Sequence, residues 1–335
     1  MTISVCMIVK NEERVLARCL DSLKGLYEEL IIVDTGSTDR TKEIASHYTD
    51  KIYDFVWVND FSAARNYAFS LATMDYIYSA DADEVLDDKN RVLFKQLKDN
   101  LLPEIEIVQM KYGNQLSFGT VYNFDEEYRP KLFKRLRNFV WIEPVHEQVR
   151  LDPVVFDSDI VITHMPESNH SGRDFAVFER AIIKDGDLSD RLWDMYAREL
   201  YLAGSDEDFI KAESFFERKA ASGISPELHQ TLCLILTHCA RIKNDVHRFL
   251  KYSVKIVTGD GCSEICMEMG LYYEGMGDLE EAAIWYYNAA FETTPILKAT
   301  SGNVDPLRHL IDINEKNGNS EMAEMYRDEL QKYMR

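Results

Sequence analysis

Three carboxylates, Asp81, Asp83 and Glu84, follow a short apolar run. That run, residues 76–80, is rich in aromatic and β-branched side chains, which is typical of a buried strand. Because side chains two residues apart in an extended chain face the same way, Asp81 and Asp83 can converge on one point across Ala82. Two hard oxygen donors suit Mg²⁺ or Mn²⁺, which commonly keeps waters and shares the phosphates of a substrate. The alternative is a solvated turn after a strand.

A second group of candidate residues occupies 141–147. Trp141 offers a flat face on which a sugar can stack, and His146, Glu143 and Glu147 offer acid–base groups beside it. A structural pair of His146 and Glu147 is the alternative.

The elements that must position these residues alternate between strand and helix over about the first 165 residues. Apolar, strand-like runs are separated by segments of helical period, and they lie at 3–9, 30–33, about 51–58 and 76–80. This alternation predicts βαβ units and an α/β fold with a mainly parallel sheet. The polar loops that follow three of these strands should share one rim, where open α/β sheets bind their ligands. A dinucleotide-type glycine fingerprint and a Walker loop are both absent from the sequence.

Four stretches together resemble the successive motifs of family 2 glycosyltransferases with the GT-A fold. They are residues 3–12, 33–39, 64–66 and 81–83. Each motif is weak alone, but they stand in the family's order and spacing over about half of the chain. The resemblance implies a nucleotide-sugar donor, a divalent metal and inversion at the anomeric carbon.

The resemblance also implies where the nucleotide lies. Val9, Asn11 and Glu12 after the first strand, with Asp34 after the second, would contact the base and ribose. A carboxylate such as Asp34 can accept from a uracil N–H, which modestly favours a UDP-sugar over a purine nucleotide. A helix cap is the alternative for Asp34.

The diphosphate and metal would lie at the next motifs. Arg65 would be near the diphosphate, Asp81 and Ala82 would lie by the ribose and metal, and Asp83 would ligate the metal. His164, at the end of another strand-like run, would complete the metal site, and its imidazole would favour Mn²⁺ over Mg²⁺. A salt-bridged surface residue is the alternative for Arg65, and a structural role for His164.

The acceptor side would lie at Trp141 and His146. An inverting transfer needs one base to deprotonate the acceptor, and we expect Glu147 in this role, with Glu143 in reserve. Arg129 belongs to a basic stretch, 128–137, that could help to hold the diphosphate. The alternative for this stretch is a solvated edge strand protected by its charge.

After Pro166 the composition becomes helical, and we expect a GT-A catalytic domain over 1–168 and an all-α domain over 169–335. Small residues at Gly270, Ala282 and Ala289, with aromatic residues between them, resemble a tetratricopeptide repeat with weaker copies around it. Stacked helix pairs make a groove suited to extended peptides. A buttress for the catalytic domain or a homodimer contact is the alternative.

The overall composition limits the classes of partner that the protein can bind. A net charge of −20 argues against nucleic acid and against anionic membrane surfaces. We find no run long enough to span a bilayer and no signal peptide, and six cysteines in such a chain suggest reduced thiols, so we expect a cytoplasmic protein.

We therefore predict an inverting, metal-dependent glycosyltransferase that uses a UDP-sugar and Mn²⁺ or Mg²⁺. Its domain pairing resembles bacterial peptide and protein glycosyltransferases such as the bacteriocin S-glycosyltransferases. This favours a peptide or protein acceptor, through Ser or Thr oxygen or Cys sulfur. The rivals are transfer to a lipid-linked or cell-envelope glycan, and a non-catalytic repeat scaffold with a relic nucleotide fold.

Overall fold

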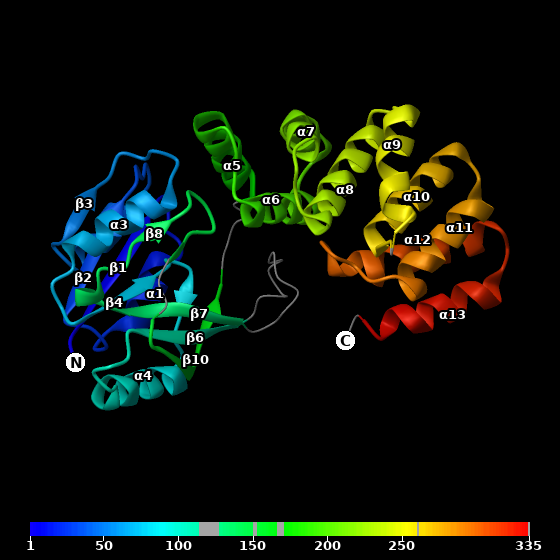
Figure 1. Ribbon diagram of the computed structural model, residues 1–335. Helices are drawn as coiled ribbons and strands as arrows, with labels where there is room; N and C mark the ends of the chain where they lie inside the picture. The colour runs from blue at the N-terminus through cyan, green and yellow to red at the C-terminus, as the bar shows by residue number, and fades with distance from the viewer. Residues whose placement is uncertain (114–126, 150–152, 166–170, 260, 334–335) are drawn as a thin grey trace. The chain divides into compact units, whose positions relative to one another are not determined.

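The chain forms two compact units, Met1–Arg180 and Ala181–Arg335. The computed structural model describes residues 1–113, 127–149, 153–165, 171–259 and 261–333 (Figure 1). The boundary expected between residues 168 and 169 lies outside these described residues. The two units are described separately below.

A mixed sheet of eight described strands forms the centre of the first unit. Its spatial order is β3-β2-β1-β4-β7-β6-β10-β5. The bounds are β1 Ile3–Val9, β2 Glu29–Asp34, β3 Ile52–Asp54, β4 Tyr76–Ala80, β5 Glu84–Val85, β6 Ile107–Gly113, β7 Glu127–Lys134 and β10 Val155–His164. All of these run parallel except β7, which lies antiparallel between β4 and β6, and β5, which is antiparallel to β10. The carboxyl ends of the parallel strands therefore share one rim.

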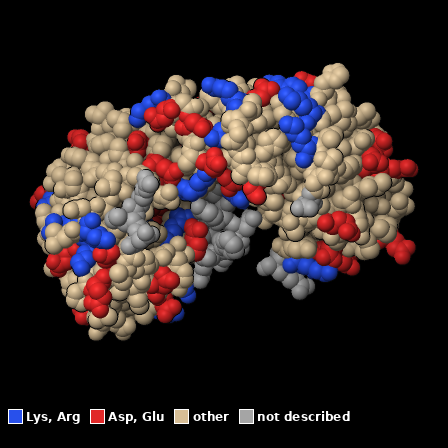
Figure 2. Space-filling model, viewed as in Figure 1, with Lys and Arg blue, Asp and Glu red and all other residues tan. Residues whose placement is uncertain are grey.

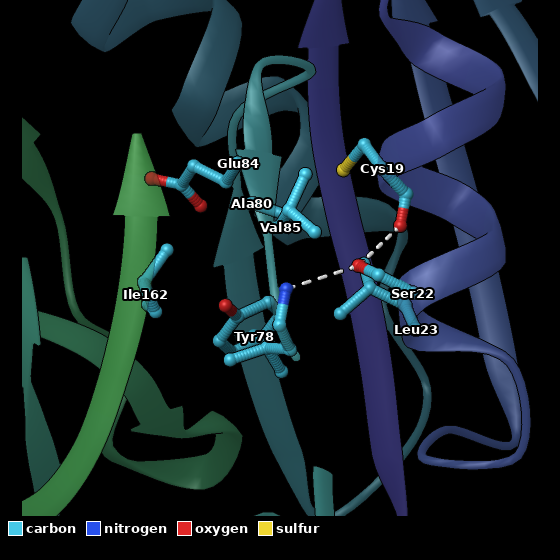
Figure 3. Close-up of a pocket in the computed structure, with 9 residues that line it drawn as sticks. Cys19, Ser22, Leu23, Tyr78, Ala80, Glu84, Val85 and Ile162 are labelled. Atoms are coloured by element: carbon cyan, nitrogen blue, oxygen red, sulfur yellow. Dashed lines mark hydrogen bonds between the residues drawn. The ribbon is translucent and has the colours of Figure 1, made fainter. Parts of the chain in front are cut away.

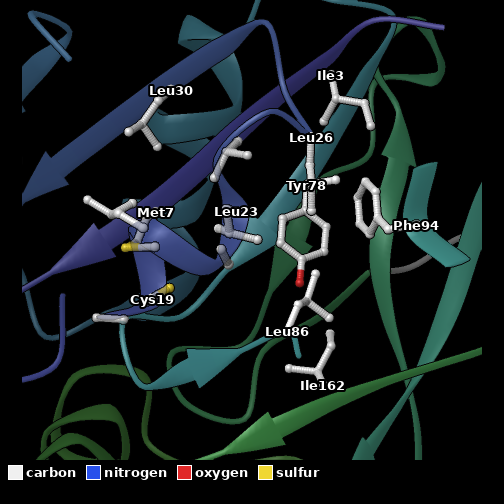
Figure 4. Packing of buried hydrophobic residues seen from close by; sticks show 14 of the residues in the cluster. Ile3, Met7, Cys19, Leu23, Leu26, Leu30, Tyr78, Leu86, Phe94 and Ile162 are labelled. Carbon is white, nitrogen blue, oxygen red and sulfur yellow. The ribbon is translucent and has the colours of Figure 1, made fainter. Parts of the chain in front are cut away.

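Helices cover both faces of this sheet, as the alternation of apolar patterns predicts (Figure 1). They are α1 Leu16–Leu23, α2 Thr41–Ser46, α3 Phe61–Leu71 and α4 Asp88–Asn100, with a 3-10 turn, η2, at Arg135–Arg137. In the core under α1 and α4, the rings of Tyr78 and Phe94 meet edge to face at 5.4 Å (Figure 4). A separate ribbon of β8 Trp141–Ile142 and β9 Gln148–Val149 carries the 141–147 stretch.

The predicted α/β fold class is confirmed, with strands 3–9 and 76–80 at the expected positions. The third strand is shorter than the predicted 51–58, because β3 ends at Asp54. The Phe55 amide still donates to the Asp34 carbonyl, but Val56 and Val58 beyond it are exposed. As β3 is an edge strand, it has a neighbour on one side only, and the chain leaves it to enter α3.

Helix pairs build the second unit. Helix α5, Ser171–Asp185, crosses the boundary between the units, and eight helices follow: α6 Asp190–Ala203, α7 Asp206–Ala220, α8 Pro226–Ile242, α9 Val246–Val257, α10 Ser263–Met276, α11 Leu279–Tyr287, α12 Val304–Lys316 and α13 Ser320–Gln331. A π turn, η3 Asn288–Glu292, and a 3-10 turn, η4 Ala299–Gly302, separate α11 from α12. Helices α8 and α9, α10 and α11, and α12 and α13 pair as tetratricopeptide-like repeats do, while α6 and α7 both pack on α8 (Figure 1).

Gly270 shows why small residues recur in these pairs. A Cβ at this position would lie 2.4 Å from Cε1 of the buried Tyr286, so only glycine allows α10 and α11 to approach this closely. Among the helices of the described segments, none is both long and apolar enough to cross a bilayer.

Candidate active site at the carboxyl rim of the sheet

The loops after β1 and β2 are tied to each other at one end of the rim. The Asn11 amide donates to Ser37 Oγ at 2.9 Å, and Asn11 Oδ1 accepts from the Thr38 amide at 2.8 Å. Asn11 has a φ of 57°, a left-handed conformation that asparagine tolerates better than most residues. The neighbouring Val9 carbonyl accepts from the Thr35 amide, and the Glu12 amide donates to Thr41 Oγ1.

Asp34 is the buried acceptor of this end. Its Oδ1 accepts from the amides of Gly36 and Ser37, both at 2.9 Å, and so holds the turn after β2. Its Oδ2 is buried and has no hydrogen-bond partner among the described residues. Asp34 does not cap α2, whose N-cap residue is Arg40. A buried acceptor without a donor is costly unless a ligand supplies one, which fits an N–H of a nucleotide base.

Arg65, on α3, connects three side chains at the middle of the rim. Its Nη2 donates to Asp81 Oδ1 at 2.9 Å, its Nη1 to Ser79 Oγ at 2.9 Å, and its Nε to Glu147 Oε1. Burial alone would raise the pKa of Asp81, but Arg65 and then Lys131 hold that pKa well below its usual range. Arg65 is therefore not the exposed, salt-bridged residue of the alternative interpretation.

Lys131 belongs to the basic stretch 128–137, but its contact with the acids after β4 was not predicted from the sequence. It is buried on β7, with its Nζ 2.6 Å from Glu84 Oε1 and 3.7 Å from Asp81 Oδ2. The pairing of β7 with β6 is irregular here, since Val108 faces Leu132 and Gln109 faces Pro130, so Lys131 is the extra residue of a bulge. The bulge directs a lysine into the acid cluster. Because β7 lies inside the sheet, the edge-strand interpretation of 128–137 is wrong.

Glu84 fixes the backbone of residues 81–84, which we call the acid loop. Its Oε2 accepts from the Asp81 amide at 3.2 Å, while burial raises the pKa of Glu84 even with Lys131 beside it. In Figure 3, Glu84 lies near Ala80 and Ile162, and Ser22 Oγ links the Cys19 carbonyl to the Leu86 amide. The gap among these residues leaves no room for a water molecule. The acid loop is therefore supported on its buried side by closely packed side chains.

Asp83 and His164 meet at the far end of the acid loop. His164 Nε2 lies 3.0 Å from Asp83 Oδ2, and the Met165 amide donates to the Asp83 carbonyl. The rings of His164 and Tyr112 lie 5.2 Å apart, and the Arg129 guanidinium lies 4.0 Å over that of Tyr112. The fold therefore brings Arg129, predicted from its charge alone, close to His164. Its Nε is paired with Glu127.

The donor set fits a divalent cation held partly by substrate. Four carboxylates, Asp81, Asp83, Glu84 and Glu147, share the cluster with two cations, Arg65 and Lys131. When all are ionised, two negative charges stay uncompensated. No group of three or more His, Cys, Asp or Glu side chains in the described ranges forms a cage for a metal. Asp83 and His164 would supply protein ligands, while both Asp81 oxygens face cations.

The 141–147 stretch contacts the cluster through Glu147. Trp141 is 7% exposed and packs against Phe69, Phe133 and Arg65, so it supports Arg65 and has no free face for stacking a sugar. His146 lies beside the Phe178 ring, at 5.8 Å, and not in a pair with Glu147. Glu143 and His146 both have positive φ values, of 71° and 47°. Such backbone conformations are costly for these residues and cluster at functional sites.

Comparison with known proteins finds a family match within the first unit. Residues 4–146 match the family model described as Glycosyl transferase family 2. A TPR repeat-containing protein of Synechococcus elongatus is 51% identical over 84 residues, which cover 25% of this chain and 21% of that protein. The SPbeta prophage-derived glycosyltransferase SunS of Bacillus subtilis is 39% identical over 92 residues, which cover 27% of this chain and 22% of that protein. The matches thus span about a fifth of these relatives.

A solved structure of more distant likeness is glucosyl-3-phosphoglycerate synthase from Mycobacterium tuberculosis in complex with Mn²⁺ and UDP-glucose. Its TM-score is 0.39 at 14% identity, over 54% of this chain and 76% of that chain.

Proposed function

We propose, from the premise that residues 4–146 form a family 2 glycosyltransferase domain, that this protein transfers a sugar from a UDP-sugar to a peptide or protein side chain, with inversion. The observation that carries the proposal is the convergence of Asp83 with His164, and of Asp81 with Arg65 and Glu147, at the carboxyl rim. Such a rim is where α/β sheets bind nucleotides.

Each part of the rim has a role in this proposal. Asp34, with its free Oδ2, accepts from the uracil N–H, and Val9, Asn11 and Glu12 form the wall around the base. Asp81 and Ala82 border the ribose. Asp83 and His164 hold Mn²⁺ or Mg²⁺, which when bound neutralises charge on the leaving diphosphate.

Arg65 and Arg129 add fixed positive charge near the diphosphate. Arg65 also fixes Glu147, because its Nε holds Glu147 Oε1 and leaves Oε2 for the acceptor proton. The ion pair therefore orients Glu147, our candidate base. A thiol acceptor, which ionises near neutral pH, would need less help from such a base than a hydroxyl would.

The helix pairs are our candidate for acceptor binding. Between α6 and α8 lies a surface cavity of about 360 Å³, lined by Asp190, Asp194 and Glu227, with Arg198 and Ile296. A cavity of this size in a helical repeat suits a side chain of an extended peptide. Association of two copies through the repeats is part of the same proposal. The six cysteines are free and buried, which supports a reducing, cytoplasmic location.

The donor half of the proposal is tested by UDP release from a panel of UDP-sugars with Mn²⁺, with Mg²⁺ and with EDTA. We expect metal-dependent release from one sugar. Glu147→Gln should lower transfer by about a hundredfold or more while UDP binding persists, and Glu143→Gln serves as the comparison. Metal-independent UDP binding without release from any sugar would instead support the scaffold interpretation.

The acceptor half needs a labelled sugar and cell extract of the producing organism. Label that is precipitated with protein and released by protease supports a polypeptide acceptor. Label that enters the chloroform–methanol phase supports the lipid-linked rival and contradicts the proposal.

A further inference from the structure

Helix α9, Val246–Val257, differs in charge from the rest of the chain. It contains Arg248, Lys251, Lys255 and His247 but no acidic residue, although the whole chain has a net charge of −20. Figure 2 shows a group of Lys and Arg side chains where Figure 1 places α9. A basic amphipathic helix is typical of membrane-surface contacts.

The outer side of α9 carries an aliphatic stripe in addition to its buried face. Val246, Leu250, Val254 and Val257 are 44%, 47%, 52% and 38% exposed, and their spacing places them on one side of the helix. The packed face is a different one, formed by Phe249, Tyr252, Ser253 and Ile256, and the ring of Phe249 stacks on Tyr272 at 4.5 Å. The stripe is therefore not needed for packing of the repeats.

Two lysines lie on one side of the stripe, on the same outer surface of α9, without acidic partners among the described residues. Lys251 and Lys255 are exposed, lie one turn apart, and make no ion pair with any residue that the structure describes. Lys251 Nζ instead lies 4.7 Å from the centre of the Tyr252 ring and donates to the Tyr252 hydroxyl at 3.2 Å. Arg248 differs from them, because Glu213 and Glu217 pair with it.

We propose that this outer face of α9 binds the surface of an anionic lipid bilayer. The aliphatic stripe would enter the boundary between headgroups and acyl chains, and Lys251 and Lys255 beside it would reach lipid phosphates with their flexible side chains. The net charge of the chain does not prevent this, because charges beyond about 8 Å are screened at physiological salt.

A lipid surface fits this face better than a protein partner does. Lysine is depleted at protein interfaces, where aromatic residues and arginine are the usual anchors, and the stripe has neither. A helix of 12 residues is only about 18 Å long, which is short for an interface of about 1,000 Å². Lipid headgroups require no complementary shape.

The inference is independent of the transfer reaction, since it concerns where the protein is held. The test is cosedimentation of the full chain with vesicles of phosphatidylcholine alone, or with about 30% phosphatidylglycerol. We expect binding to the anionic vesicles only, weaker at about 500 mM than at about 50 mM NaCl. Each lysine near an anionic surface contributes about fivefold, so the double variant Lys251→Glu/Lys255→Glu should bind at least tenfold more weakly.

Two further double variants make the test specific. Leu250→Asp/Val254→Asp, on the stripe, should also lose binding, whereas Lys89→Glu/Lys95→Glu, which makes the same charge change on exposed residues of α4, should bind like the unchanged protein. Circular dichroism checks that each variant is folded. Absence of binding at low salt, or full binding by folded α9 variants, would overturn the proposal. So would a dimer, seen in sedimentation velocity, that the stripe variant dissociates.

Discussion

Replacing Arg65 by methionine should reveal how much the acid cluster depends on one guanidinium. The substitution keeps an unbranched apolar stem but leaves Asp81 and Glu147 without their closest cation, since only Lys131 remains, 3.7 Å from Asp81 Oδ2. Removing one partner of a buried ion pair typically costs about 3–5 kcal/mol, because the remaining charge is desolvated and unpaired. We expect a loss in this range at pH 7.5.

The pH dependence of that loss follows from Asp81. In the unchanged protein the pKa of Asp81 is lower in the folded than in the unfolded state. Its ion pairs therefore stabilise the fold at pH values above the unfolded pKa, and this stabilisation is lost in acid. Without Arg65, burial dominates and raises the folded pKa, so the variant loses stability as pH rises through the unfolded value. The difference between the two proteins should therefore shrink between pH 7.5 and pH 5.

Urea unfolding at several pH values measures both quantities, without metal or nucleotide. Arg40→Met is the matched control: Arg40 pairs with Glu43 on the surface, where solvent screens the pair, so its removal should change stability little. Arg65→Lys keeps the charge but cannot make all three contacts, so it should lie between the other two. A loss below about 1 kcal/mol, or one equal at both pH values, would refute this account of the cluster.

Three further predictions concern other parts of the chain. Burial alone would raise the pKa of Glu29, but hydrogen bonds from Lys51, Ser4 and Thr73 lower it from 4.5 to about 2. Glu29→Gln should therefore cost about 3 kcal/mol near pH 7 and little near pH 2, where the carboxyl is protonated in the unfolded chain and about half protonated in the folded protein. Urea unfolding at both pH values measures this, and an equal cost would contradict it. Gly270→Ala should lower the free energy of unfolding by about 1–3 kcal/mol, because the new Cβ would clash with Tyr286. Gly275→Ala, on the same helix but with open space around its Cβ, should raise that free energy by up to about 1 kcal/mol. Equal effects in urea unfolding would exclude the clash. Lys131→Met should weaken UDP binding with Mn²⁺ by about tenfold or more, because repulsion between Asp81 and Glu84 would shift the acid loop. Calorimetry measures this affinity. An unchanged affinity would show that the lysine at the bulge has no part in the site.

The sheet was predictable where the apolar pattern is uninterrupted. Residues 3–9 and 76–80 carry continuous buried runs, and the acids after 80 had to lie at the carboxyl rim. The place of β7 was not predictable, because no local pattern indicates that a strand from 127–134 enters antiparallel between β4 and β6.

The candidate site, like the sheet, was predictable from the sequence only in part. The contact between Asp83 and His164 joins two residues that the sequence assigned to one metal centre on family resemblance. Lys131 was predicted only as one of the basic residues of 128–137, because its contact with Glu84 depends on a bulge, which is a property of the pairing between strands. Trp141 was expected to offer a stacking face, yet the packing of Phe69 and Phe133 around it is a tertiary feature.

The central claim is that the carboxyl rim binds UDP together with a divalent metal through Asp83. Calorimetry of UDP binding, with Mn²⁺ and with EDTA, tests it most directly. We predict binding that requires Mn²⁺, is weakened at least tenfold in Asp83→Asn, and is unchanged in Asp99→Asn, which makes the same change on an exposed residue of α4. UDP binding that is equally strong with EDTA and in Asp83→Asn would contradict the claim.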